Sequence, residues 1–347
     1  MNEKMKTLKR ENVIKVFNAS LERNNTSRTV IAEDSHLSFV TVDKIVDALL
    51  DADILKQTNS SKSAVVLRKS RILLAKPHYW IAVYVLSDSE YSFHICDLSL
   101  RIIKSFSFVP EDTVFIDDNL SSFLKKTLSF AKAYVVPEYC CAAGILVPGE
   151  YDEPRDRVFN SSVSHLSAIS IKSFFSPFSF GKLPYVVSVY SAFAKEIAKV
   201  GADKSTYCLF LNDGKVLGAY VTGVGSSIHI KDLGNIKSPS GRTLEALVKA
   251  VPHPDSLFVP LSEILFTLLH TVHITDITVC GNLYSSSGAV CSMLKKELSR
   301  YCERYSILSP EITAPDLLEN SVRFISREIR DRWFSEEILG FDTDNDK

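Results

Sequence analysis

Hydroxyl-bearing and basic side chains gather at the start of two short segments near the N-terminus. Ser27 is followed by Arg28, and Ser38 is followed by Thr41 and Lys44. Such groups can hydrogen-bond to DNA phosphates and base edges, and an adjacent apolar side chain can pack on a thymine methyl group. The candidate contacts to double-stranded DNA are therefore Ser27, Arg28, Ser38, Phe39, Thr41, Lys44 and Lys62.

Three helices must position these side chains. The spacing of apolar residues predicts helices over Lys9–Arg23 and Phe39–Ala52. Between them, Thr26 or Ser27 can cap a short helix that runs through Asp34, and Ser38 can cap the third helix. A tight turn at His36 and Leu37 would separate the second and third helices. The buried stripe of the third helix would be Val42, Ile45, Val46, Leu49 and Leu50.

A two-stranded wing is predicted after the third helix. Ile54–Lys56 and Ala64–Leu67 have the composition of strands, and the polar tip Gln57–Ser63 separates them. A basic cluster follows, at Arg68, Lys69 and Arg71. Two crossed helices followed by such a hairpin are typical of a winged helix-turn-helix, whose second helix enters the major groove of DNA. We place this domain at residues 1–71.

The same helical pattern also fits a three-helix packing module with a solvated polar face. Asp43, Asp47 and Asp51 lie on the third helix and count against a strongly basic surface there. Residues 1–71 carry 13 Lys and Arg against 9 Asp and Glu, a net charge of +4, whereas the remainder carries 27 against 32, a net charge of −5. A basic N-terminal domain on an acidic body favours a phosphate-binding module attached to a regulatory domain.

Length and composition exclude several classes of protein. The 347 residues suit a small domain plus a larger one, and 46% hydrophobic with 23% charged residues is typical of a folded soluble protein. We expect a cytoplasmic protein, because we find neither an apolar run of membrane-spanning length nor a secretory signal. The seven cysteines form no Cys-x-x-Cys pair, which favours buried thiols over metal ligands.

The segment Asn12–Leu55 resembles the DNA-binding domain of the ROK family (repressors, open reading frames and kinases). It is most similar to the branch of the xylose and N-acetylglucosamine repressors. One departure is Asp53, which stands where the family usually has glycine. The residues that carry the resemblance are Thr26-Ser27-Arg28, Ile31-Ala32, Leu37–Val42, Ile45-Val46, Leu49-Leu50 and Asp53–Leu55.

The resemblance continues more weakly to about residue 330. Ala143–Gly149 resembles the family's "Gly-Ile-x-x-Pro-Gly" strand and turn, and Leu183–Val187 resembles its "Leu-Pro-Val" strand. The family fold implied by these matches has two ribonuclease-H-like lobes, as in actin and the sugar kinases, with a cleft between them. Val279–Asn282 would lie at the family's glycine turn near the nucleotide.

The positions that perform phosphoryl transfer in this family are altered here. Tyr190 stands where the family has its catalytic Asp, and a phenol is a poor base at neutral pH. Val85–Ser89 contains no glycine at the first phosphate loop, and the second reads Asn212–Val216 with a single glycine. We therefore expect no kinase activity and no nucleotide cofactor.

The family's zinc and sugar motifs are also changed. Ile236–Thr243 contains no cysteine where the zinc ligands would lie, so no metal is expected. By resemblance, Asp232, Asn235 and Glu245 match the residues that hold sugar hydroxyls. The alternative is that Asp232 and Asn235 are turn residues around a glycine and Glu245 is a charge at a helix start.

Together these features predict an α/β chain with a winged helix-turn-helix at 1–71 and a two-lobed ROK-type domain at 72–347. Lobe 1 would span about 72–185 and lobe 2 about 186–347. The last helix, Ala314–Phe334, would pack on lobe 2 or return to lobe 1.

The expected function is a DNA-binding transcriptional regulator. We expect a homodimer or a dimer of dimers on an operator, with a sugar-like small molecule as effector and no membrane partner. The alternatives are an active ROK sugar kinase with an appended helix-turn-helix and a scaffold that binds other proteins.

Overall fold

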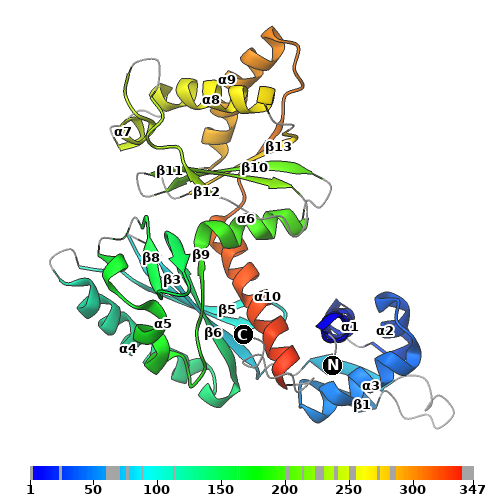
Figure 1. Ribbon diagram of the computed structural model, residues 1–347. Helices are drawn as coiled ribbons and strands as arrows, with labels where there is room; N and C mark the ends of the chain where they lie inside the picture. The colour runs from blue at the N-terminus through cyan, green and yellow to red at the C-terminus, as the bar shows by residue number, and fades with distance from the viewer. Residues whose placement is uncertain are drawn as a thin grey trace.

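The chain folds into a small N-terminal head and a two-lobed body (Figure 1). The head is formed by the described residues between 3 and 75, and the body by those between 78 and 337. The computed structural model describes residues 3–22, 26–59, 71–75, 78–87, 89–111, 114–161, 163, 165–200, 204–212, 215–222, 230–237, 241–249, 255–271, 274–281 and 287–337.

The three predicted helices of the head are confirmed. Ser27 caps the second helix by accepting a hydrogen bond from the backbone N–H of Val30, and Ser38 caps the third by accepting one from Thr41. His36, at φ 55°, ends the second helix in the left-handed conformation. The helices are α1 (Glu3–Glu22), α2 (Arg28–Ser35) and α3 (Phe39–Asp51).

The wing is an antiparallel pair of β1 (Leu55–Asn59) and β2 (Arg71–Ala75), in which Leu55 pairs with Ala75. The predicted strand at Ala64–Leu67 and the candidate Lys62 lie outside the described residues. The proposed boundary at residue 71 is wrong, because it would separate β2 from the strand with which it pairs. The head therefore continues at least to Ala75.

Two sheets of identical topology form the body. In each, the first three strands form an antiparallel meander and two later strands add in parallel beside the first, the order of a ribonuclease-H-like lobe. The first sheet comprises β3 (Trp80–Leu86), β4 (Tyr91–Asp97), β5 (Ile102–Phe108), β6 (Cys140–Val147) and β9 (Tyr185–Ser188). The second comprises β10 (Ser205–Asn212), β11 (Lys215–Thr222), β12 (Ile230–Asp232), β13 (Asp276–Cys280) and β14 (Glu311–Thr313).

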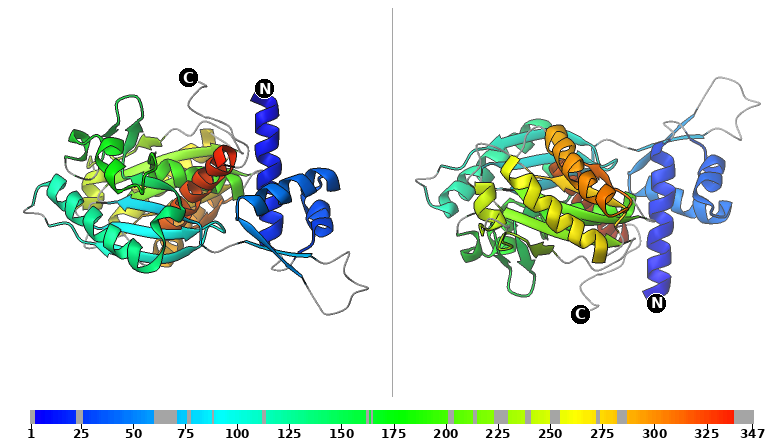
Figure 2. Two further views of the ribbon diagram at one scale, coloured as in Figure 1. Left: turned by 90° about the horizontal axis from the view of Figure 1, so that it is seen from below. Right: turned by 90° about the horizontal axis from the view of Figure 1, so that it is seen from above.

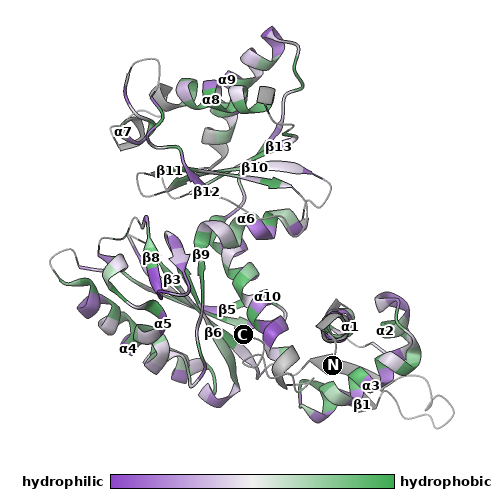
Figure 3. Cartoon of the chain, in the orientation of Figure 1, coloured by the Kyte–Doolittle hydropathy of each residue, from purple (hydrophilic) through white to green (hydrophobic). Residues whose placement is uncertain are grey.

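Helices cover both sheets (Figure 1). Amphipathic helices such as α4 and α10 alternate hydrophobic and hydrophilic residues along their length (Figure 3), which is the pattern of a helix with one buried face. The remaining elements are α4 (Ile116–Tyr134), η1 (Pro137–Tyr139), β7 (Glu150–Asp152), β8 (Arg157–Phe159), η2 (Leu166–Ala168), α5 (Ile171–Phe175), η3 (Ser176–Phe178), α6 (Val189–Val200), α7 (Leu244–Lys249), α8 (Asp255–Thr271), α9 (Ser287–Arg304) and α10 (Leu317–Glu337).

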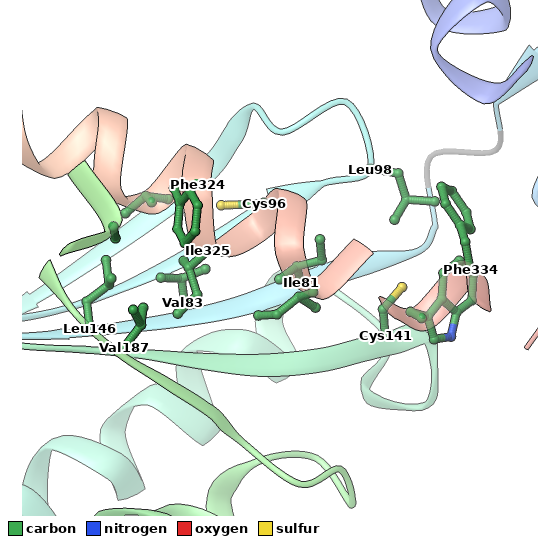
Figure 4. Packing of buried hydrophobic residues seen from close by; sticks show 14 of the residues in the cluster. Ile81, Val83, Cys96, Leu98, Cys141, Leu146, Val187, Phe324, Ile325 and Phe334 are labelled. Atoms are coloured by element: carbon green, nitrogen blue, oxygen red, sulfur yellow. The ribbon is translucent and has the colours of Figure 1, made fainter. Parts of the chain in front are cut away.

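The last helix, α10, returns to the first lobe and covers its sheet, so the expectation that it packs on lobe 2 is wrong. Phe324 and Ile325 lie against Val83 and Leu146, from β3 and β6 (Figure 4). A Cβ at Gly144 in β6 would lie 2.6 Å from a side-chain carbon of Ile325, which explains why glycine is needed where helix and sheet meet. The first sheet extends through β9 to Ser188, near the expected lobe boundary at about 185.

The head is joined to the body through α1 and α10. The ring of Phe17 in α1 lies 4.7 Å from that of Phe334 in α10, and the hydroxyl of Tyr79 donates to the backbone oxygen of Ala52 at 3.0 Å. The right-hand view of Figure 2 shows α2 on the far side of α1 from the body. Because Tyr79 contacts Ala52 at the C-terminal end of α3, the N-terminal end of α3 is the end away from this contact.

Burial explains the cysteines. Six of the seven thiols are buried and Cys291 is half-buried, which confirms their expected place in the core. Burial raises the pKa of Cys96, Cys140 and Cys208 to about 12, so these thiols stay protonated at neutral pH. None of the helices in the described ranges is both long and apolar enough to cross a bilayer.

Candidate functional site

The N-terminal turn of α3 presents apolar side chains to solvent. Phe39 is 51% exposed and Val40 is 63% exposed, whereas Val42 and Val46 on the opposite side of the helix are fully buried. Lys44, one turn further along, is exposed. An exposed aromatic side chain on a helix that also carries an exposed cation suits contact with a base edge and a phosphate.

The hydroxyls at this helix start are already engaged. Ser38 Oγ accepts from the backbone N–H of Thr41 at 3.2 Å and lies 2.8 Å from Thr41 Oγ1. Ser27 Oγ accepts from the N–H of Val30 at 3.3 Å. A capping hydroxyl has one further lone pair and its own proton, so Ser38 and Thr41 can still contact DNA, but their first role is to fix the helix start.

Arg28 is placed differently from the sequence-based expectation. Its side chain is only 15% exposed, and its guanidinium forms ion pairs with Asp43 and with Asp47, the latter at 2.7 Å. Burial lowers the pKa of Arg28, but the hydrogen bonds to Asp47 and Asp43 outweigh this and leave the pKa above its ordinary value. The group is thus a fixed cation that ties α2 to α3, and its N–H donors point at carboxylates.

This pairing changes the charge of the α3 surface. Asp43 and Asp47, two of the three acids that counted against DNA binding, are ion-paired with Arg28, so these three side chains carry a net charge of −1 in place of the −2 of the two acids alone. Lys44 is an exposed cation near the start of α3. Of the candidates in the head, the structure brings together Arg28, Ser38, Phe39, Thr41 and Lys44 on or beside one helix.

In the body, Tyr190 lies at the base of the cleft, 2% exposed, with its ring 5.0 Å from that of Phe210. It lines a cavity of about 30 Å³ between the two sheets. This volume holds about one or two water molecules, so it is too small for a sugar ring in this arrangement. Polar side chains from both lobes reach the cavity: its lining includes Glu150, Asn160, Ser188, Tyr190, Leu217 and Asp232.

Sequence reasoning missed three of these polar residues, Glu150, Asn160 and Ser188. Glu150 directly follows the "Pro-Gly" turn of the best family match in the body, and Asn160 Nδ2 donates to Glu150 Oε1 at 3.2 Å. The signal that could have found Glu150 is its place after that turn. Asn160 carries no such signal, because the β7–β8 hairpin brings it to the cavity.

The candidates from lobe 2 form a turn. Asp232 Oδ1 accepts from the N–H of Gly234 at 2.7 Å, and the N–H of Glu245 donates to the carbonyl oxygen of Gly234 at 3.0 Å. Asp232 lines the small cavity, whereas Asn235 is exposed and neither Asn235 nor Glu245 is among the described lining residues. The structure therefore brings Asp232 to the cleft together with Glu150 and Asn160.

Comparisons with known proteins bear on this arrangement. No protein-family model and no curated protein sequence matches the chain. Among solved structures, a ROK family transcriptional regulator, a homolog of the E. coli MLC protein, matches with a TM-score of 0.68 and 14% identity over 96% of this chain and 100% of that one.

Two further solved structures match the body. A ROK family protein from Streptococcus pneumoniae TIGR4 in complex with sucrose has a TM-score of 0.55 and 13% identity, covering 74% of this chain and 99% of its own. ROK hexokinase from Thermus thermophilus has a TM-score of 0.52 and 12% identity, covering 73% and 99%.

The regulator extends the match from the two lobes over the head. The expected fold class is confirmed: this chain has the fold of the ROK family, in the two-domain form found in a ROK transcriptional regulator.

Proposed function

We propose that this chain is a ROK-family transcriptional regulator that binds double-stranded DNA through its head. The observation that carries the proposal is the surface of α3, where Phe39, Val40 and Lys44 are exposed. A helix in the major groove contacts base edges with its N-terminal residues, which are the residues exposed here. Arg28 supports this surface by pairing with Asp43 and Asp47, which offsets one of their two negative charges.

A second copy of the chain completes the site. One recognition helix contacts too few base pairs for specific binding, so two-fold pairing on a pseudo-palindromic operator doubles the contact. The head to Ala75 is the DNA-binding unit, and the two lobes are the unit that pairs the copies and receives a small-molecule effector. Lys62 would reach the phosphate backbone from the tip of the wing.

The body performs no phosphoryl transfer in this proposal. General base catalysis needs a group that accepts the proton of the attacking hydroxyl near neutral pH. The side chain at the base of the cleft is the phenol of Tyr190, which is buried against the ring of Phe210 and is a poor proton acceptor at neutral pH.

The test is DNA binding by fluorescence anisotropy, after selection of bound fragments from the source genome. We expect one or a few preferred fragments, with affinity that falls as salt concentration rises. Lys44→Ala should weaken binding to all fragments alike and reduce the salt slope by about 1, since one phosphate contact is lost. Phe39→Ala should instead relax the preference between fragments.

Lys125→Ala is the matched control, because Lys125 is an exposed lysine on α4 in the body, far from the head. It should leave binding unchanged. The proposal is wrong if no fragment is preferred and Lys44→Ala binds DNA as Lys125→Ala does.

The second candidate is a sugar kinase with an appended helix-turn-helix, favoured by the match of the body to a ROK hexokinase. A coupled assay of ATP consumption over a panel of hexoses and amino sugars distinguishes the two. Turnover with any of these sugars would establish the kinase.

A further inference from the structure

A cavity larger than the one at Tyr190 lies elsewhere in the cleft. It has a volume of about 440 Å³ and lies at the carboxyl ends of β3, β6 and β13, beside the first turn of α10. In open α/β sheets this edge is where ligands bind, and the volume is within the range of small-molecule sites. The residues that line it come from both lobes, so an occupant would touch both at once.

The walls of this cavity are mainly apolar. The apolar side chains include Val85, Leu86, Pro148, Val189, Val279 and Leu318. Cys280, which also lines it, has a pKa raised well above its ordinary value by burial and stays a neutral thiol. Walls of this kind favour the apolar part of a ligand.

The charges at the cavity are negative. Glu90 and Asp316 are the ionisable carboxylates among its described lining residues, and that set contains no Lys, Arg or His. Asp316 Oδ1 accepts from the N–H of Glu319 at 2.6 Å and so caps α10. Ser87 Oγ fixes the backbone of Glu90 through bonds of 2.6 Å and 3.2 Å. A phosphate here would meet like charge without a counter-ion, whereas a cation would be attracted.

One wall carries an oriented hydroxyl. Ser92 Oγ lies 2.9 Å from Nε2 of His94, whose Nδ1 lies 2.8 Å from Ser105 Oγ. Burial lowers the pKa of His94 to about 4, so the ring is neutral at neutral pH. A neutral imidazole donates from one ring nitrogen and accepts at the other, so His94 links the hydroxyls of Ser92 and Ser105. Ser92 therefore offers a polar point of contact close to Glu90 without adding positive charge.

The glycine in the lining has a structural reason. Gly281 has φ 136°, and a Cβ there would lie 2.1 Å from the carbonyl oxygen of Leu211. The end of β13 thus needs glycine to pass close to β10, whether or not a phosphate is bound. The family resemblance places this glycine turn near the nucleotide. Because the close approach of the two strands already explains the glycine, the resemblance gives no support to nucleotide binding here.

From these features we propose that the 440 Å³ cavity is the effector site of this protein, and that its ligand is a small, mainly apolar molecule that carries one amine. The apolar walls hold the body of the ligand, and Glu90 with Ser92 receives the ammonium group. The consequence for DNA binding rests on the function proposed above, whereas the binding of the ligand does not.

Helix α10 connects this cavity to the head. Its first turn, with Leu317 and Leu318, lines the cavity, and its last turns pack on α1 through Phe334. Ser321 Oγ donates to the carbonyl oxygen of Val189 at 3.0 Å, which holds α10 against the start of α6. A helix of this length is a rod of about 30 Å, so a ligand that displaces its first turn also moves the surface on which the head rests.

The experiment is calorimetric titration of the full chain, without DNA, with four probes: phenethylamine, phenethyl alcohol, phenylacetate and ADP. The first three share an aromatic body of similar size and differ in charge. We expect phenethylamine to bind about fivefold more tightly than the alcohol, and phenylacetate and ADP to bind more weakly than the alcohol. Glu90→Gln should lower the affinity for the amine to that for the alcohol, whereas the exposed control Glu138→Gln should not.

The ligand assignment is wrong if the amine and the alcohol bind with equal affinity, if phenylacetate or ADP binds more tightly, or if no probe gives heat. Each of these outcomes would leave the DNA-binding proposal intact. The effector role is tested separately. Saturating phenethylamine should change operator affinity of the wild type by about fivefold or more and that of Glu90→Gln by less. Binding of the amine with unchanged operator affinity would overturn that role.

Discussion

The start of α3 and the edge of the large cavity both carry carboxylates, yet their electrostatic character differs. On α3, Asp43 and Asp47 are paired with Arg28, and Lys44 is a further exposed cation near the helix start. At the cavity, Glu90 and Asp316 have no cation among the described lining residues. The charge of a surface therefore depends on which residues are paired, and counting acids along a segment does not reveal it.

The two regions also use apolar residues differently. Phe39 and Val40 project into solvent from a convex helix, whereas Val85 and Val189 line a concave cavity. A convex apolar point beside a cation suits insertion into a groove, and a concave apolar wall beside an anion suits enclosure of a small cation. Each of the following predictions changes one of these features.

The largest effect is expected from Tyr190→Asp, which restores the family's carboxylate to the cleft. It should lower the free energy of unfolding by about 4 kcal/mol, because a charge replaces a ring packed on Phe210. Urea unfolding measures this, with Tyr190→Phe as the matched control that loses about 1 kcal/mol. ATP turnover by the Asp variant with any hexose would show that the cleft retains the other parts of a kinase.

Arg28→Leu should weaken operator binding by about a hundredfold, since it leaves two carboxylates unpaired beside the phosphates of DNA. The sharper test is to add Asp43→Asn and Asp47→Asn to this variant. Anisotropy titrations should then show binding at least as tight as that of the wild type, because the triple variant carries no net charge at these three positions, against −1 in the wild type. If the triple variant binds as weakly as Arg28→Leu, then Arg28 contacts DNA directly and our comparison fails.

Acid should destabilise the body through His94. Because burial lowers its folded-state pKa to about 4, the unfolded chain binds the proton first as pH falls below about 6.5. The stability is fully present above about pH 6.5 and is lost progressively down to about pH 4, with a loss of about 2 kcal/mol between about pH 7 and about pH 5.

Urea unfolding of the wild type and of His94→Gln at both pH values isolates this contribution, since the other titrating groups are common to both. Equal pH dependence in the two proteins would mean that His94 is not held neutral.

The smallest effect is expected at Asp53, which has φ 61° just after α3. Asp53→Gly should raise the free energy of unfolding by about 0.5 kcal/mol, because glycine adopts the left-handed conformation without strain. Asp53→Val should lower it by about 1 kcal/mol. Both should bind the operator as the wild type does. Altered operator binding in Asp53→Gly would show that the end of α3 takes part in recognition.

Local patterns were sufficient to predict the elements of the head. A serine cap and apolar residues at helical spacing define each of α2 and α3, and both depend on residues within a few positions of one another. The strand and turn at Ala143–Gly149 were predicted for the same reason: β6 is a continuous buried run that ends at a Pro-Gly turn. The predicted strand at Ala64–Leu67 lies outside the described residues, and the segment that pairs with β1 in the structure is Arg71–Ala75. This pairing joins Leu55 to Ala75 over a long separation in sequence, so local patterns did not identify it.

Only the tertiary structure decided which charges meet. Arg28 and Asp43 lie on different helices, and their separation in sequence says nothing of the crossing that brings them together. Glu150 and Asn160 reach the small cavity through a hairpin, and α10 lies on the first sheet because Gly144 leaves room for Ile325. Hydrophobic periodicity identifies the face of an element that is buried, but packing selects its partner, and the partner determines what a polar residue beside it can do.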